Sequence, residues 1–403
     1  MMQTARSETL ADNNLDANAI SVNARRLAPA IAARSAEIEA LRRLPSDLVR
    51  DLREAGIFRM AMPRWRGGPQ MSLREQVEVI EILSHADPSV GWCTMIWIDN
   101  GLFSTWLGDA GTELFPSLDT ICAGNASPIG RADRVEGGYV VSGRWPFGSG
   151  VQHADVLCAG CIVHENGAPV PSRDNPALPF EFRIMFAPAS GFVIEDSWHT
   201  TGLAGSGSTH YAAEHLFVAE AHSFSLFDPP SERLMREPLY AFRGNYWDTG
   251  AGVPLGLARR AIDEALAIAE TKLDLFTQRP LRELPRVQLA IAEAEMAYGA
   301  ARAFLHESLD RFWAELEAGV SSITLPTRTA RVLSHVNAYR MAHRVSDAMF
   351  RLAGSAALYK PAPLDRLMRD AATINLHMAI SDAALETYGT MALGSPHPVS
   401  AIW

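Results

Sequence analysis

The sequence has few cysteines and no excess of positive charge. Only four of its 403 residues are cysteine, which is too few for the disulfide framework of a small secreted protein. Acidic residues outnumber basic ones, and the formal net charge at pH 7 is −10. Because phosphate contacts require clustered Lys and Arg, we expect no nucleic-acid partner.

Long hydrophobic runs are also absent. No window of about 18 apolar residues occurs, so no transmembrane helix is expected. Residues 1–16 are polar and of mixed charge, without the apolar core of a secretory signal peptide. We therefore expect a cytoplasmic protein that has no membrane partner.

The motifs of several enzyme classes are missing. There is no G-x-x-x-x-G-K-[ST] loop, no G-x-S-x-G elbow and no H-E-x-x-H sequence. Cys158 and Cys161 form a C-x-x-C pair, but they lie in an apolar run typical of a buried strand, with no second ligand pair nearby. Gly252 and Gly256 precede a helix outside any βαβ unit, which favours a packed helix start over a dinucleotide site. We expect no metal site.

Three zones of the chain differ in their pattern. Residues 18–119 carry apolar side chains at helical spacing. Residues 120–235 consist of short β-branched and aromatic runs between Gly, Pro and Asn, with Gly137-Gly138 as a hairpin signal. Residues 245–395 contain four long amphipathic segments, a pattern that predicts a four-helix bundle.

Individual helices can be placed within these zones. Residues 23–44 read as one amphipathic helix, and Asp87-Pro88 opens a second helix that is apolar nearly all round and therefore belongs in the interior. The last segment begins after Pro363 and is predicted to run on as a helix through residue 389.

Four segments in the same order resemble the acyl-CoA dehydrogenase superfamily over about residues 25–395. The resemblance implies an α+β protein of the acyl-CoA dehydrogenase fold. Its N-terminal helical domain would cover 18–119, a middle antiparallel β-barrel domain 120–235, and a C-terminal four-helix bundle 245–395. The segments are LVRDLREAGIFRMAMPRWRGGP with LSHADPSVGW, GYVVSGRWPFGSGVQHADVLCAG, DSWHTTGLAGSGSTHYAAEHLFV and GSAALYKPAPLDRLMRDAATINLH.

The catalytic carboxylate of the dehydrogenases is missing at its usual place. In those enzymes a glutamate follows an Arg-Asp pair eight residues after the aspartate, and counting from Arg369-Asp370 gives Met378, preceded by His377. A thioether cannot accept a proton. The chain is more similar to the flavin-dependent monooxygenases of this fold, the oxygenase components of two-component systems that act on dibenzothiophene, phenols and secosteroid phenols.

This closer resemblance implies the reaction and its cofactor. It predicts a monooxygenase that uses dioxygen and reduced FAD or FMN to hydroxylate a small phenol-like or indole-like substrate through a C4a-hydroperoxyflavin. The Arg-x-x-Phe-Gly stretch that holds flavin in the dehydrogenases is absent from residues 272–285, so a diffusible flavin is expected. No nicotinamide-binding motif is present, which implies a separate NAD(P)H-flavin reductase, and analogy with the family implies a homotetramer.

The resemblance also assigns site residues. His377 would be catalytic, since an imidazole titrates near neutral pH, although a plain core histidine is the alternative. Ser149, between two glycines, could place its hydroxyl or backbone N–H against the flavin, with a simple turn serine as the alternative. The expected flavin contacts are Asn125, Phe147, Ser149, Trp198, Gly205, Ser206 and Ser208, and the expected substrate pocket comprises Trp92, Ile96 and Met378.

Two other functions stay open at this point. A true acyl-CoA dehydrogenase would need a displaced base such as Glu264 or Glu270, but Glu264 lies in a charged stripe typical of a solvated helix face. A non-catalytic flavin-binding member of the family would simply have lost its base. An acyl-CoA would bleach the flavin of the dehydrogenase, whereas the monooxygenase would act only with a reductase.

Overall fold

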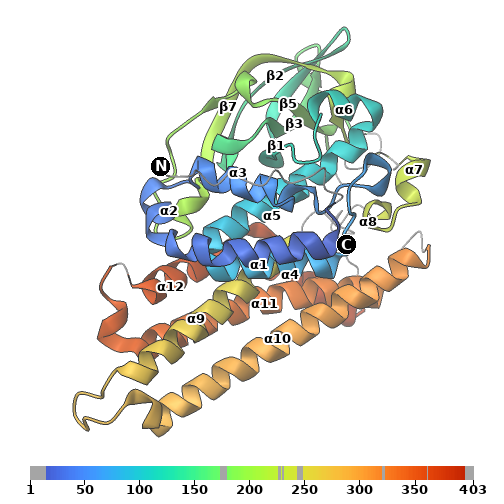
Figure 1. The fold of residues 1–403 in the computed structure, drawn as a ribbon. Helices are drawn as coiled ribbons and strands as arrows, with labels where there is room; N and C mark the ends of the chain where they lie inside the picture. The colour runs from blue at the N-terminus through green and yellow to red at the C-terminus, as the bar shows by residue number, and fades with distance from the viewer. Residues whose placement is uncertain are drawn as a thin grey trace, which may run out of the picture.

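Helices precede and follow a central sheet (Figure 1). Two of the expected domain limits, 245 and 395, lie outside the described residues, and the division into three domains stays a prediction. The computed structural model describes residues 15–172, 179–225, 228, 231–242, 248–319, 323–360 and 362–394.

Side chains cap the starts of α4 and α5, and the start of α5 at Asp87-Pro88 is the one that the sequence predicts. Ser72 and Glu75 form a reciprocal capping box at the start of α4, and Asp87 accepts hydrogen bonds from two backbone N–H groups at the start of α5. The single helix expected over residues 23–44 is wrong, because the backbone leaves helical geometry at Arg34, whose guanidinium binds Glu37 and Asp47. The helices are α1 (Ala17–Ala33), α2 (Ser35–Leu41), α3 (Ser46–Glu54), α4 (Leu73–Ala86), α5 (Pro88–Leu102) and α6 (Gly111–Leu114).

Helix α5 is the central element of the molecule. Every residue of α5 except Ile96 is buried, which confirms the prediction of an interior helix. It contacts β1 on one side and α4 and α9 on the other, so it lies between the sheet and the C-terminal helices (Figure 1).

The sheet has eight strands in the order β6-β7-β2-β1-β3-β5-β8, with β4 paired to β3. The predicted hairpin between β1 and β2 is confirmed, with Gly137 at a φ of 77°. The other strand pairs are antiparallel, as predicted for this domain, but β1 and β3 are parallel, which corrects the expectation of an antiparallel barrel at this pair. The hairpin returns the chain to the end where β1 starts, and a short link then places β3 beside β1 in the same direction. The strands are β1 (Cys122–Val135), β2 (Gly138–Gly148), β3 (Val156–Glu165), β4 (Ala168–Pro169), β5 (Phe182–Pro188), β6 (Val193–Ile194), β7 (Thr209–Ala219) and β8 (Ser223–Phe224).

Long helices form the C-terminal part, as predicted (Figure 1). The last predicted helix is interrupted, however: α12 ends at Ile374, a short turn follows, and α13 starts at Asp382. His377 caps that turn with its own side chain, so it lies in a break between helices and not within one. The helices are α7 (Glu232–Met235), α8 (Pro238–Ala241), α9 (Gly252–Thr271), α10 (Pro285–Glu317), α11 (Leu325–Ala353), α12 (Pro363–Ile374) and α13 (Asp382–Ala392).

Two further findings concern the described part of the chain alone. None of its helices has both the length and the apolar character needed to cross a membrane. Cys158 and Cys161 are buried in β3 with free thiols, and no group of three or more His, Cys, Asp or Glu among these residues is arranged to hold a metal ion.

Candidate active site

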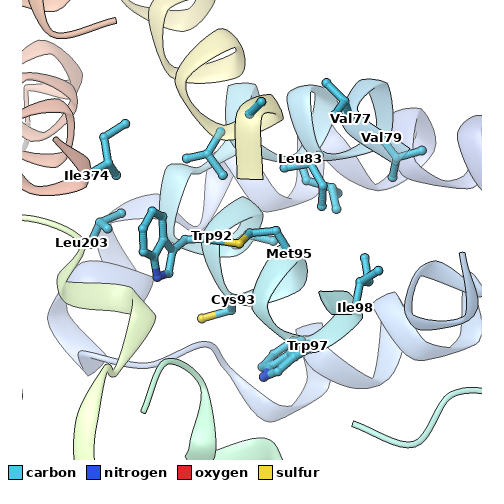
Figure 2. Close-up of a cluster of buried hydrophobic side chains, with 14 of the residues drawn as sticks. Val77, Val79, Leu83, Trp92, Cys93, Met95, Trp97, Ile98, Leu203 and Ile374 are labelled. Carbon is cyan, nitrogen blue, oxygen red and sulfur yellow. The ribbon is translucent and has the colours of Figure 1, made fainter. Parts of the chain in front are cut away.

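Three segments that are distant in sequence meet beside the N-terminal half of α5. Trp92 of α5 donates a hydrogen bond from its indole Nε1 to the Ser149 hydroxyl, over 3.0 Å. The His377 ring lies edge-on to the Trp92 ring, with 5.7 Å between the centroids. The indole of Trp92 points away from α5 toward Leu203 and Ile374 (Figure 2). The structure therefore brings together the predicted residues Trp92, Ser149 and His377.

A tight turn at the end of β2 places Ser149. Phe147 has a φ of 60°, a conformation that non-glycine residues rarely adopt, and its carbonyl accepts the Ser149 backbone N–H over 2.9 Å. Gly150 has a φ of 67°, and a Cβ there would lie 2.5 Å from the Trp97 indole. The glycine after Ser149 is therefore required both by backbone conformation and by the close approach of α5.

The Ser149 hydroxyl is the first of three linked serine hydroxyls. Its Oγ lies 2.7 Å from Ser208 Oγ, which lies 2.7 Å from Ser206 Oγ. Ser206 Oγ in turn donates to the Leu203 carbonyl over 2.7 Å. All three serines are buried. We call the connected groups of Trp92, Ser149, Ser208, Ser206 and the Leu203 carbonyl the serine relay.

The end of the serine relay is held by a buried carboxyl group. Leu203 has a φ of 48°, and its backbone N–H donates to Asp370 Oδ1 over 2.6 Å. Burial, together with the neighbouring charge of Asp87, raises the pKa of Asp370 to about 7. The Leu203 carbonyl also accepts from Trp198 Nε1 over 2.9 Å. Sequence reasoning missed Leu203 and this role of Asp370, although the Arg-Asp pair had marked the position.

His377 is a neutral histidine in this environment. Burial lowers its pKa to about 4. Its Nδ1 accepts the Ala379 backbone N–H over 3.2 Å, which in a neutral imidazole leaves the proton on Nε2. His377 is therefore suited to donate a hydrogen bond through Nε2 and unsuited to act as a cation.

Beside the turn, Phe147 and Trp198 form an exposed aromatic surface. Phe147 is 65% exposed, and its ring stands edge-on to Trp198 at 6.4 Å between centroids. Asn125 supports the adjacent strand end, because its Nδ2 donates to the Pro146 carbonyl over 2.9 Å. The exposed ring of Phe147 can pack against the flat apolar body of a flavin ring, and the buried hydroxyl oxygen of Ser149 can meet the polar edge of that ring. The residues present thus fit the cofactor that the sequence predicts.

The remaining predicted contacts are placed as follows. Gly205 packs tightly, since a Cβ there would lie 2.2 Å from Ile38. Ile96, one turn beyond Trp92 on α5, is partly buried, whereas Met378 is 72% exposed. The assignment of Met378 to the substrate pocket, like that of Ile96, stays a prediction.

An acidic residue that sequence reasoning missed lies on the same face of α5. Asp99 follows Trp92 and Ile96 at helical spacing, and its Oδ1 accepts the Thr249 hydroxyl over 2.7 Å. Burial raises the pKa of this carboxyl group well above its ordinary value. An acidic residue inside an otherwise apolar helix was the signal that could have identified it.

The two candidates for a displaced base, Glu264 and Glu270, both lie on α9. Glu264 forms an ion pair of 2.7 Å with Arg260, which also contacts the carbonyl of His85 at the end of α4. Glu270 is exposed near the end of α9. Within the described residues, neither carboxylate contacts the cluster of Trp92 and His377.

Family models and known relatives match most of the chain. Residues 16–114 match the acyl-CoA dehydrogenase N-terminal domain and residues 249–400 the acyl-CoA dehydrogenase C-terminal domain. Indole-3-acetate monooxygenase of Pseudomonas putida is 31% identical over 90% of this chain and 90% of its own. The flavin-dependent monooxygenase oxygenase subunit HsaA of Rhodococcus jostii is 28% identical, over 92% of this chain and 97% of its own.

A solved structure of an enzyme with a related name has the same fold as this chain. The crystal structure of 3-HSA hydroxylase from Rhodococcus superposes with a TM-score of 0.86 at 26% identity, covering 96% of this chain and 99% of the other. Similarity at this level extends through the helices and the sheet alike.

Proposed function

This chain belongs to the acyl-CoA dehydrogenase family, as a flavin-dependent monooxygenase of that fold, and we propose that it hydroxylates a small indole-like or phenol-like substrate. The observation that carries the proposal is the neutral His377 beside Trp92 and Ser149, next to the position where the dehydrogenases keep their carboxylate. That position is Met378, whose side chain cannot take a proton. Relatives named for indole-3-acetate and for resorcinol support an aromatic substrate.

Each residue of the site has a role that follows from its surroundings. Reduced flavin, when bound, supplies the electrons with which dioxygen is activated. Phe147 and Trp198 offer the aromatic surface for its ring, and the buried face of α5 around Trp92 keeps water away. His377 donates from Nε2 to a polar atom of the substrate or the oxygen being transferred.

We further propose that the flavin is a diffusible reduced FAD or FMN delivered by a separate NAD(P)H-flavin reductase in the cytoplasm. Residues 272–285 lack the arginine motif with which the dehydrogenases hold flavin, and the chain has no nicotinamide motif. The HsaA relative is named an oxygenase subunit, which supports a separate protein for flavin reduction.

The oligomer that we propose is a homotetramer. Leu289 and Met296, seven residues apart on α10, are both exposed, as are Leu275 and Phe276 in the loop after α9. Large apolar side chains gathered on exposed helices mark surfaces that bind other proteins. Packing of the C-terminal helices between copies would cover them.

The test of the proposed function is product formation. The purified chain, a flavin reductase, NADH, FMN or FAD and oxygen would be incubated with indole-3-acetate and with a panel of phenols. We expect a product that carries one additional oxygen atom, detected by mass spectrometry and absent without the reductase. No such product with any indole or phenol, together with anaerobic bleaching of bound flavin by an acyl-CoA, would show a dehydrogenase instead.

A further inference from the structure

The serine relay has a fixed direction. The Trp92 indole nitrogen can only donate and the Leu203 carbonyl can only accept. Because the Ser206 proton goes to the Leu203 carbonyl, Ser206 must accept from Ser208, and Ser208 must then accept from Ser149. The Ser149 proton therefore points inward along the relay.

This direction decides what Ser149 can offer to a ligand. Its hydroxyl proton is committed to Ser208 and its backbone N–H to the Phe147 carbonyl, so it has no proton left to give. One lone pair of its Oγ accepts from Trp92 Nε1. The second lone pair has no partner among the described residues. Ser149 can therefore present only a hydrogen-bond acceptor.

We propose that Ser206 and Ser208 are positioning residues that hold Ser149 as an acceptor, so that the site selects reduced over oxidised flavin. This inference rests on the proposed function, which places the flavin ring at Phe147 and Ser149. The N5 atom of reduced flavin carries a hydrogen that an acceptor can bind. The N5 atom of oxidised flavin presents a lone pair, which would face another lone pair at Ser149 Oγ.

The burial of the two serines supports this role. Ser206 and Ser208 are 1% and 3% exposed. The hydrogen bonds that their hydroxyls form with each other, with Ser149 and with the Leu203 carbonyl therefore lie inside the protein. The backbone also fixes them, because the Ser206 carbonyl accepts from Gly150 N–H over 2.9 Å and from the Cys93 thiol over 3.3 Å. The relay is thus joined to α5 and to the turn of Ser149 at the same point.

The experiment compares flavin affinities without any turnover. Dissociation constants of oxidised FMN and of dithionite-reduced FMN would be measured anaerobically by calorimetry for the native chain, Ser208→Ala and Ser206→Ala. We expect the native chain to bind reduced FMN about tenfold or more tightly, the factor for one hydrogen bond of ordinary net strength. In Ser208→Ala the Ser149 hydroxyl can turn outward, so the ratio should fall toward one, and in Ser206→Ala it should fall part of the way.

Two controls separate the relay from a general loss of structure. Ser308→Ala on α10 removes a buried hydroxyl that donates to the Phe304 carbonyl and should leave the ratio unchanged. Ser208→Thr keeps a hydroxyl and should retain the preference. An unchanged ratio in folded Ser208→Ala, or equal affinities in the native chain, would overturn the relay while leaving the monooxygenase function intact. Failure to bind FMN or FAD in either redox state would overturn both.

Discussion

At the scale of single residues, the site depends on protonation states that burial imposes. His377 carries no charge because its surroundings penalise the imidazolium, and Asp370 carries a raised pKa for the same reason. A neutral imidazole with Nδ1 bound to a backbone N–H has one defined donor, Nε2. Such a group can hold a proton in place across the whole neutral range.

The neutral state of His377 predicts how enzymatic activity and protein stability depend on pH. Because its pKa falls from 6.5 to about 4 in the folded protein, the activity should show no break due to this residue between pH 6 and 8. The unfolded chain binds the proton more readily, so His377 contributes full stability above pH 6.5, and this contribution is lost as pH falls toward 4. A pH profile of initial rates and urea unfolding at several pH values would measure both effects.

The variant His377→Ala tests the catalytic role directly. Loss of a positioned proton donor should lower the hydroxylation rate by roughly 10²–10⁴-fold, while the reduced-flavin affinity changes little. His343→Ala, an exposed histidine on α11, is the matched control. Activity within a factor of about two of the native rate in His377→Ala would contradict the assigned role.

At the scale of elements, the packing of α9 against α4 explains the two glycines in the first turns of α9. A Cβ at Gly252 would lie 2.5 Å from the Val77 carbonyl oxygen, and one at Gly256 would lie 2.3 Å from the Glu81 carbonyl oxygen. The two helices therefore approach backbone to backbone. The spacing that resembled a nucleotide loop is a helix-crossing contact, which agrees with the packed helix start that the sequence favoured.

Gly→Ala substitutions should distinguish the effect of packing at this crossing from the effect of helix propensity on the free energy of unfolding. Gly256→Ala should lower the free energy of unfolding by about 1–3 kcal/mol, because the added methyl group overpacks a rigid contact. Gly299→Ala on α10, where nothing lies within 4 Å of the added Cβ, should raise it by about 0.5–1 kcal/mol. Chemical denaturation of both variants measures the difference, and equal effects would mean that the close approach is not maintained.

At the scale of the whole molecule, the proposed active site lies where the sheet, α5 and the C-terminal helices meet. Ser149 and Ser206 come from the sheet region, Trp92 from α5 and His377 from the break after α12. No single part of the chain holds the site, so its geometry depends on the docking of all three. Exposed apolar residues on α10 lie on the outside of this assembly.

The molar mass of the protein in solution tests the proposed homotetramer. Light scattering after size exclusion should give about four times the 44.0 kDa of one chain. A charge at Met296, in Met296→Glu, should shift the protein to smaller species, since the apolar face of α10 would no longer be covered. Val22→Glu, at an exposed apolar residue of α1, should not. A monomeric native chain, or an unchanged mass in Met296→Glu, would contradict the proposed interface.

The sequence alone predicts the start of α5, the buried character of this helix and the missing carboxylate. These features depend on residues near one another in the chain: Asp87 with the N–H groups that follow it, and Met378 counted from Arg369-Asp370. Similarity to a known family predicts the fold, apart from the parallel pairing of β1 with β3 and the break between α12 and α13.

The hydrogen-bonding and protonation states of the candidate site residues depend on the tertiary structure. The direction of the serine relay depends on Trp92 and Leu203, and the neutrality of His377 depends on burial by segments far away in sequence. A hydroxyl or an imidazole has several protonation and hydrogen-bonding states, and nothing local selects among them. The contacts that fold the chain around Ser149 and His377 make that selection.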